Sequence, residues 1–310
     1  MSAAKIGLVG ARGHTGRELI RLISARDDME LTFASSRELG GKRITDVAPE
    51  ADPTVKFVTL GPDEIAKSGV DAIILALPNG ASSSFVAAIE ARAPDMLIVD
   101  LSADYRFDTD WAYGLPEIQG RDHIAASHRI ANPGCYATAG QLAIAPMLEH
   151  LAGAAHVFGV SGYSGAGTTL SRKNDTEALR DNLMPYALTG HIHEREMSRH
   201  LDCDIRFSPH VAAFFRGISA TVHMPLKSPT TLEEIRALYQ ACYEGEALIR
   251  IRENIPELRE GAFQPGAVIG GFSLSADGHH LVVVSVLDNL LKGAAVQAVQ
   301  NVSIALGLPE

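Results

Sequence analysis

The amino-acid sequence predicts an α/β protein of two domains, the first built on a parallel sheet and the second on a mostly antiparallel one. In residues 1–134, short β-branched runs alternate with helical patterns, which is typical of a parallel sheet covered by helices. In the second half, strand-like runs follow one another directly, which favours antiparallel pairing. A chain of 310 residues, 46% hydrophobic and 21% charged, is long enough for two such domains.

The first domain is expected to contain five strands and at least two helices. The stripe of Leu19, Ile20, Leu22 and Ile23 marks the first helix. The predicted strands are 6–10, 30–36, 55–58, 71–78 and 96–102, and the predicted helices are 15–26 and 81–92.

The second half begins with a helix and continues with strands. A long polar stretch, 172–200, separates the first strand from the next two. Threonine at the start of one helix predicts a cap, and an Asp-Gly turn at 277–278 predicts a hairpin within 266–288. The predicted helices are 141–151, 230–244 and 288–308, and the remaining predicted strands are 155–167, 205–211 and 217–226.

The last helix begins with Asp288 or Asn289 as its cap, and its periodicity does not decide which domain it packs on. We expect a first domain that includes 1–134 and a second domain at 135–287.

Composition points to a small-molecule partner in the cytoplasm. A net charge of -10 argues against nucleic acid or an anionic membrane, because phosphates attract basic faces. The N-terminus has no secretory pattern, and no apolar run approaches the ~20 residues that span a bilayer. Three widely spaced cysteines, Cys135, Cys203 and Cys242, do not suit a disulfide framework and indicate reduced thiols.

Three glycines, Gly10, Gly13 and Gly16, stand between the first strand and the first helix. This context predicts a Rossmann dinucleotide-binding loop, in which the first glycine makes the tight turn and the others admit a pyrophosphate. The spacing is G-x-x-G-x-x-G rather than G-x-G-x-x-G, and a glycine-rich turn without a ligand is the alternative.

The second strand ends in Ser36 and Arg37, where a carboxylate would bind the ribose hydroxyls of NAD. Hydroxyl and guanidinium groups suit a 2'-phosphate, so NADP(H) is the predicted cofactor. A solvated loop arginine is the alternative for Arg37.

Cys135 follows Asn-Pro-Gly at the start of a small-residue helical stretch. Backbone N–H groups and the positive end of the helix dipole favour a thiolate there and can stabilise an oxyanion on a carbonyl that the sulfur attacks. Cys135 is therefore the predicted nucleophile, whereas Cys203 and Cys242 lack this setting.

A proton carrier is expected in GHIHEREM, residues 190–197, where His191 and His193 alternate and Glu194 and Glu196 could orient an imidazole. A metal site is a competing interpretation, but the spacing matches no standard zinc pattern, and we predict no metal.

Arg106 and Arg216 each follow an apolar or aromatic stretch and could bind phosphate or carboxylate in a bidentate manner. A structural ion pair is the alternative for each.

Taken in order along the chain, these motifs resemble the N-acetyl-gamma-glutamyl-phosphate reductase family in its shorter form. The matching segments are GARGHTGREL, DLSADYRF, NPGCYATA, GVSGYSGAG, GHIHEREM and DNLLKGAAVQAVQN. The family's cofactor loop usually reads GASGYTG, and Arg12 and His14 replace its serine and tyrosine here, while Thr15 and the glycines are kept.

The resemblance implies a second domain like that of glyceraldehyde-3-phosphate and aspartate-semialdehyde dehydrogenases and a homo-oligomer, dimer or tetramer. It also implies that the last helix returns to the first domain, so that the first domain is 1–134 and 288–310 and the second is 135–287. It also implies that Cys135 is the nucleophile, that His193 is the acid/base and that Glu196 positions substrate or imidazole. Substrate-binding roles fall to Arg106, Ser161, Glu196 and Arg216. Cofactor-binding roles fall to Gly10, Arg12, Gly13, His14, Thr15, Gly16, Ser36, Arg37, Gly162, Ser164 and Gly165.

The implied reaction is the NADPH-dependent reduction of the acyl phosphate N-acetyl-L-glutamyl 5-phosphate through a Cys135 thioester, in arginine biosynthesis. The same chemistry on an aminoadipate or aspartyl phosphate is the first alternative. A non-catalytic NADP-sensing protein is the second.

Overall fold

The computed structural model describes residues 3–310, which divide into two compact units. Among these residues, unit 1 is 3–133 with Ala294–Glu310, and unit 2 is Gly134–Gly293. The chain returns to unit 1 at Ala294 rather than at Asp288, because the Asp288 and Asn289 side chains bond to Arg216 and Gly217 inside unit 2.

Unit 1 is built on a seven-stranded sheet in which every neighbouring pair is parallel, in the order β3-β2-β1-β4-β5-β7-β6. Its strands are β1 (Ala4–Val9), β2 (Met29–Ser35), β3 (Phe57–Val58), β4 (Ala72–Leu75), β5 (Leu97–Asp100), β6 (Ala112–Tyr113) and β7 (Arg129–Ala131). Its helices are α1 (His14–Ser24), η1 (Ile44–Asp46), α2 (Pro62–Ala66), α3 (Ser83–Arg92), α4 (Pro116–Gln119), α5 (Arg121–Ala125) and α11 (Val296–Leu306). The five predicted strands are present, and β6 and β7 are two short strands that the sequence analysis did not predict.

Helices cover both faces of this sheet, so its central strands are buried on both sides. Ile74 of β4 joins the core beneath α1 and α11, while Ile73 and Leu75 of the same strand join the core beneath α2 and α3. The chain moves outward from β1 through β2 to β3 and then returns to β4 on the other side of β1. The carboxyl ends of β1 and β4 therefore flank a topological switch point, where such sheets bind ligands.

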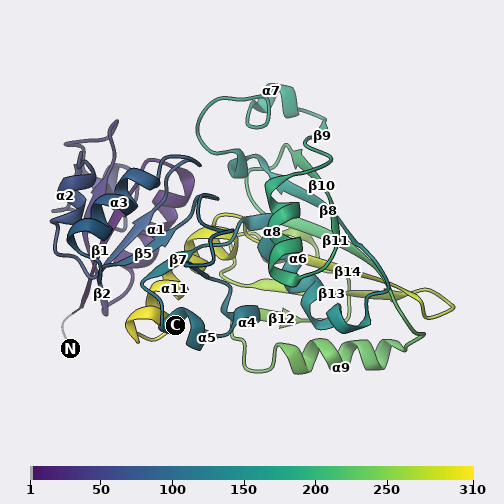
Figure 1. Cartoon of the computed structure of the whole chain (residues 1–310). Coiled ribbons are helices and arrows are strands. Elements are labelled where there is room, and N and C mark those ends of the chain that lie inside the picture. The colour runs from purple at the N-terminus through teal and green to yellow at the C-terminus, as the bar shows by residue number, and fades with distance from the viewer. Residues whose placement is uncertain (1–2) are drawn as a thin grey trace. The chain divides into compact units, whose positions relative to one another are not determined.

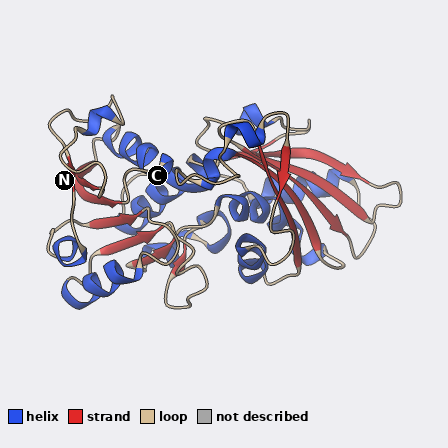
Figure 2. Ribbon diagram, turned by 90° about the horizontal axis from the view of Figure 1, so that it is seen from above, coloured by secondary structure: helices blue, strands red, loops and turns tan. Residues whose placement is uncertain are grey.

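Unit 2 is built on a seven-stranded mixed sheet in the order β12-β13-β14-β11-β8-β10-β9. Its strands are β8 (Ala155–Gly162), β9 (Leu183–Pro185), β10 (Ile205–Ala212), β11 (Ile218–Pro225), β12 (Ile249–Ile251), β13 (Ala267–Leu274) and β14 (His280–Leu287). Its helices are α6 (Cys135–Ile144), η2 (Ala145–His150), η3 (Tyr163–Ala166), α7 (Thr176–Leu179), α8 (Ile192–Leu201), α9 (Leu232–Cys242), α10 (Leu258–Gly261) and a π-helical segment, η4 (Leu291–Ala295), at its end. Figure 2 draws the two sheets in red.

Most neighbouring strands of the second sheet are antiparallel, as predicted, and β8–β10 and β12–β13 are the parallel pairs. Buried and more exposed residues alternate along β8, β10 and β11, which is the pattern of a sheet covered on one face. Helices α6, α8 and α9 pack against the sheet, and Figure 1 shows α6 beside α8.

Three helical predictions need correction. The helix predicted at 141–151 extends back to Cys135, where the preceding Pro-Gly indicates a helix start. It changes to the 3-10 segment η2 just before Pro146, because proline cannot donate the next helical hydrogen bond. The polar stretch 172–200 contains α8, whose charged outer face hid its periodicity. The last regular helix, α11, begins at Val296, after the π-helical segment.

Local capping follows the sequence more closely. Thr231 and Glu234 form the reciprocal capping box of α9, at 3.2 and 2.9 Å. Gly278, with φ +74°, makes the turn between the antiparallel strands β13 and β14.

Candidate active site

The glycine loop links β1 to α1 at the switch point of unit 1. Gly10 has φ +84°, and a Cβ there would clash with the carbonyl oxygen of Ala76, which follows β4. A Cβ on Gly16 would lie 2.6 Å from the Ala11 carbonyl oxygen. Gly13 caps α1, and a Cβ there would meet no heavy atom within 4 Å. The first and third glycines are therefore required by the fold, and the middle one faces open space.

His14 and Thr15 open helix α1 directly after this open position, and both are half-buried. The first N–H groups of a helix have no partner within the helix and carry the positive end of its dipole. The cap residue of α1 is Gly13, which has no side chain to accept from these N–H groups, so this N-terminus suits an anion such as a pyrophosphate.

The end of β2 lies against the same loop, since Gly10 N–H and Ala11 N–H both donate to the Ser35 carbonyl oxygen at 3.1 Å. Ser36 is buried, and its hydroxyl accepts from Leu39 N–H at 3.3 Å. Arg37 is exposed, and among residues 3–310 it makes no hydrogen bond or ion pair.

Arg12 does not extend freely from the glycine loop. Its Nη1 lies 2.5 Å from both Oε1 and Oε2 of Glu38, and both side chains are partly exposed. Glu38 is a carboxylate just beyond β2, three positions after the strand ends, and the sequence reasoning passed over it in favour of Ser36 and Arg37.

Cys135 is the first residue of α6, and Gly134 caps that helix in an extended conformation. The thiol side chain is half-buried, and all three cysteines are free. The chain passes very close to Cys135 at Gly293, where an added Cβ would lie 2.7 Å from Cys135 Cβ. This close approach explains why the π-helical segment η4 carries a glycine.

Helix α8 brings His193 and Glu196 to the start of α6. The two residues are three positions apart and therefore share a helix face. Glu196 is fully buried, and its Oε1 accepts from Gly134 N–H at 2.8 Å. One turn further along, a Cβ on Gly140 of α6 would clash with the Met197 sulfur, so the two helices touch. Glu196 thus fixes the turn that presents Cys135.

Several aromatic side chains lie near His193. The Tyr136 ring lies 6.0 Å from His193 between centroids and makes an edge contact with Phe207, and Tyr136 O–H donates to the His210 carbonyl oxygen at 2.5 Å. Burial, and next the charge of a Cys135 thiolate, raise the pKa of Tyr186. Tyr186 therefore stays neutral beside the candidate nucleophile, and no local motif marks this residue in the sequence.

His191 has a different role from His193. It caps α8, and its Nδ1 accepts from His193 N–H at 3.1 Å. Burial, and next the positive charge of Lys173, hold the pKa of His191 below its usual value. The neutral ring is the form that can accept this hydrogen bond, so His191 acts as a structural cap.

Ser161 and Gly162 end strand β8, and Ser164 and Gly165 lie in the 3-10 segment η3 that makes the loop after it. Both serines are buried, and Ser161 Oγ donates to the Gly162 carbonyl oxygen at 2.9 Å. A Cβ on Gly162 would lie 2.5 Å from the Phe215 carbonyl oxygen, and one on Gly165 would lie 3.2 Å from Ser161 Oγ. Small residues are therefore required for this loop to pack.

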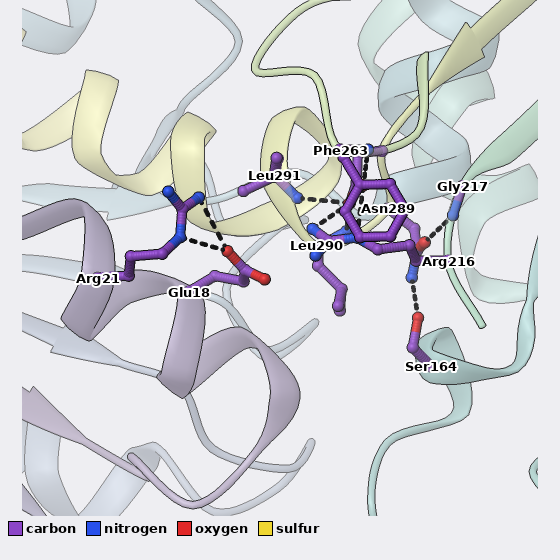
Figure 3. A network of polar contacts seen from close by, with 10 residues as sticks. Glu18, Arg21, Ser164, Arg216, Gly217, Phe263, Asn289, Leu290 and Leu291 are labelled. Atoms are coloured by element: carbon purple, nitrogen blue, oxygen red, sulfur yellow. Dashed lines mark hydrogen bonds and ion pairs between the residues drawn. The ribbon is translucent and has the colours of Figure 1, made fainter. Parts of the chain in front are cut away.

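Asn289 joins this loop to the one at Arg216. Its Nδ2 donates to Ser164 Oγ at 2.9 Å, and its Oδ1 accepts from Gly217 N–H at 2.6 Å, as Figure 3 shows.

Arg216 makes a buried bidentate ion pair with Asp288, with Nε and Nη2 at 2.5 and 2.8 Å from the two carboxylate oxygens. Asp288 has no exposed surface and also accepts from three backbone N–H groups, those of Phe263, Leu290 and Leu291 (Figure 3). The structure places Arg216 in the ion pair that the sequence offered as the alternative to substrate binding.

Arg106 is buried in unit 1 in the loop after β5. Its Nε donates to the Asn132 carbonyl oxygen at 2.9 Å and its Nη2 to that of Leu101 at 2.8 Å. Asp100, at the end of β5, accepts from the Ser82 hydroxyl at 2.6 Å, and burial raises the pKa of its carboxyl group. Arg106 therefore holds in place the segment at Asn132, which lies three residues before Cys135.

Among residues 3–310, no three His, Cys, Asp or Glu side chains gather in a way that could hold a metal ion. Within the same range, none of the helices combines the length and apolar character needed to cross a membrane.

Comparison with known proteins identifies the family. Residues 5–127 match the family model described as "Semialdehyde dehydrogenase, NAD binding domain", and residues 135–289 match "Semialdehyde dehydrogenase, dimerisation domain". A relative from Stenotrophomonas maltophilia, named N-acetyl-gamma-glutamyl-phosphate reductase, is 53% identical over 309 residues, covering 100% of this chain and 97% of the relative. The chain belongs to the N-acetyl-gamma-glutamyl-phosphate reductase family.

Other members agree with this assignment. A reductase of the same name from Xanthomonas campestris is 53% identical over 98% of this chain and 96% of its own. The Neurospora crassa "Protein arg-6, mitochondrial" is 48% identical over 99% of this chain, which matches 36% of that longer protein.

Solved structures confirm the fold of this reductase family member. Aspartate semialdehyde dehydrogenase II from Vibrio cholerae superposes with a TM-score of 0.81 at 15% identity, covering 99% of each chain. The enzyme from Candida albicans, solved with NADP, superposes with a TM-score of 0.75 at 16% identity, covering 98% of each chain. The chain is thus an oxidoreductase of the semialdehyde dehydrogenase fold with a nicotinamide dinucleotide-binding domain.

Proposed function

We propose that this chain reduces N-acetyl-L-glutamyl 5-phosphate to N-acetyl-L-glutamate 5-semialdehyde and inorganic phosphate, with NADPH as the reductant, in arginine biosynthesis. The observation that carries the proposal is the 53% identity, over the whole chain, to proteins named for this activity. The helix-start position of Cys135 supplies the chemistry that such a reaction needs.

The glycine loop fits a dinucleotide. The open space at Gly13 has room for a pyrophosphate, and the first N–H groups of α1, at His14, Thr15 and Gly16, would hold its oxygens. The preference for NADP over NAD rests on Ser36 and Arg37 at the end of β2, with Arg37 exposed and available to a 2'-phosphate. Arg12 completes the predicted set.

Cys135 begins the reaction as a thiolate. Its sulfur attacks the acyl carbon of the acyl phosphate, the bond between that carbon and the phosphate oxygen breaks, and phosphate leaves with the bonding electrons. The product is a thioester on Cys135. N–H groups at the start of α6 are suited to stabilise the oxyanion that forms during the attack.

Bound NADPH supplies the hydride that reduces the thioester carbonyl. His193 carries the proton: it protonates the resulting alkoxide and takes the proton back as the carbon–sulfur bond breaks. The aldehyde is released and the Cys135 thiolate is regenerated. Glu196 supports this step by holding Gly134, and hence the turn before the nucleophile, in place.

We assign the substrate's anionic groups to Arg106 and Arg216, and its remaining polar contacts to Ser161 and Glu196. Gly162, Ser164 and Gly165 are the residues of unit 2 that we propose for cofactor binding. For Arg216 the proposal requires the guanidinium to keep Asp288 on one edge and present its other edge to substrate.

The test is a panel of three semialdehydes, those of N-acetylglutamate, aspartate and aminoadipate, oxidised by the purified enzyme with NADP and phosphate. We expect the N-acetylglutamate compound to have the highest kcat/KM. A higher value for either of the others would replace the proposed substrate, and no turnover of any would favour a non-catalytic NADP-sensing protein.

Cys135→Ser should lose nearly all turnover in this assay, with Cys242→Ser, an exposed free cysteine, as the matched control. His193→Asn should lose turnover and keep cofactor binding.

The dimerisation-domain match and the sheet face that the helices leave uncovered support a homo-oligomer, which we propose to be a dimer or tetramer. Light scattering coupled to gel filtration measures the number of chains, and a monomer at working concentration would contradict it. Three free thiols suit the reducing cytoplasm, where we place the enzyme. Cell fractionation tests this location.

A further inference from the structure

We propose that Arg12 sets the dinucleotide preference of this chain indirectly, by neutralising Glu38 so that the site accepts a 2'-phosphate. The inference rests on the proposed use of NADP. It assigns to Arg12 a specificity-determining role that differs from gripping the cofactor phosphates directly.

The first argument is position. A carboxylate just after the second strand of a dinucleotide-binding sheet is the group that hydrogen-bonds the adenosine ribose hydroxyls of NAD and repels the 2'-phosphate of NADP. Glu38 stands three residues after β2, and the glycine loop is bonded to the last residue of that strand, Ser35. Glu38 therefore lies where a charged carboxylate favours NAD.

The second argument is the geometry of the pair. Arg12 Nη1 lies 2.5 Å from each carboxylate oxygen of Glu38, so neither oxygen faces the site as an isolated charge. The turn that carries Glu38 is fixed by Leu39 N–H donating to Ser36 Oγ and by Ser36 N–H donating to the Val58 carbonyl oxygen. These two hydrogen bonds hold the Glu38 carboxylate within reach of Arg12 in the glycine loop.

The third argument is the balance of charge. With Glu38 engaged by Arg12, the exposed Arg37 is left as net positive charge at the end of β2, and this suits a phosphate monoester. Without Arg12, the charges of Arg37 and Glu38 cancel and a ribose hydroxyl gains an acceptor. The pair is exposed on both sides, so breaking it changes binding with little effect on folding.

The experiment is a double-mutant cycle read out by calorimetric titration of NADP+ and NAD+ into the full chain. Arg12→Ser should raise the ratio of the NADP+ Kd to the NAD+ Kd by about tenfold or more, the size of one hydrogen bond to a charged group. In the Glu38→Gln background, the same Arg12→Ser change should alter the ratio by less than about threefold, because no carboxylate is left to neutralise.

Two controls separate this role from its alternatives. Arg37→Ser should weaken NADP+ binding in both backgrounds, as a direct phosphate ligand does. Arg21→Ser removes a comparable surface pair, that of Arg21 with Glu18 on α1 (Figure 3), and should leave the ratio unchanged.

An equal change of the Kd ratio by Arg12→Ser in the wild-type and Glu38→Gln backgrounds would overturn the inference, because it would indicate that Arg12 binds the phosphate directly. An unchanged ratio in Arg12→Ser would overturn it as well. The titrations contain no acyl phosphate, so failure here leaves the proposed reductase activity standing. If Arg12 and Glu38 are coupled in this way but the chain reduces no acyl phosphate, the proposed reductase activity is refuted and this inference stands.

Discussion

Replacing Asp288 by asparagine should destabilise unit 2 strongly. Asp288 Oδ2 lies 2.5 Å from Arg216 Nε and 2.6 Å from Phe263 N, and the residue has no exposed surface. Asparagine removes the negative charge. If the asparagine carbonyl oxygen keeps the bonds to Leu290 N–H and Leu291 N–H, its NH2 group takes the place of Oδ2. That NH2 group then faces the donors Arg216 Nε and Phe263 N–H and can accept from neither.

The magnitude follows from the burial of the pair. Removing one member of a buried ion pair leaves the other charge uncompensated, which costs about 3–5 kcal/mol. Domains of 150–250 residues lose about 2–4 °C in Tm for each kcal/mol, so the transition of unit 2 should fall by about 6–20 °C. Scanning calorimetry measures this directly.

Glu177→Gln is the matched control, because Glu177 pairs with Arg180 at 2.5 Å in the same unit but with both side chains well exposed. Such a pair contributes about 0–1 kcal/mol, so this variant should melt within a few degrees of wild type. The double variant Arg216→Met with Asp288→Asn should recover part of the loss, because no charge is left buried. A Tm for Asp288→Asn equal to that of Glu177→Gln would refute the view that this ion pair holds unit 2 together.

Three further predictions concern other parts of the chain. Gly13→Ala should fold normally and raise the NADP+ Kd by about tenfold or more, because its methyl group enters the space proposed for the pyrophosphate. Normal NADP+ binding by this variant would contradict the loop assignment, whereas Gly10→Ala should instead lower the Tm. Glu196→Ala should lower the free energy of unfolding in urea by about 1–3 kcal/mol more than Glu196→Gln, which can still accept from Gly134 N–H, and equal losses would argue against that bond. Because burial lowers the pKa of His191, the unfolded chain binds its proton more readily below about pH 6.5, so the stability of the folded chain falls with acid. His191→Asn keeps a cap on α8 and should lose less stability than wild type between about pH 7.5 and about pH 5.5, and identical losses would contradict the lowered pKa.

The parallel domain could be predicted well because its strands are short, apolar and punctuated by glycine or proline. The Gly10 and Gly16 positions follow from close backbone approaches that no other residue tolerates. Cys135 could also be placed at a helix start, since Pro-Gly before a small-residue run is a local signal.

The contacts between distant segments could not be predicted from local patterns. Asp288 was interpreted as a helix cap, and it does accept from Leu290 N–H and Leu291 N–H, but its partner Arg216 lies 72 positions away. The Arg12–Glu38 pair depends on the loop and the second strand meeting in space. For Glu38 a signal was present, because a carboxylate near the end of the second strand is a known determinant of dinucleotide choice.

A thioester on Cys135 can be trapped by mixing the enzyme with N-acetylglutamate semialdehyde and NADP in the absence of phosphate, then measuring intact mass and the burst of NADPH. We expect close to one NADPH per chain and a mass gain of one N-acetylglutamyl group on the peptide that contains Cys135, both absent in Cys135→Ser. A full burst without acylation of Cys135, or acylation of Cys203 or Cys242 instead, would contradict it.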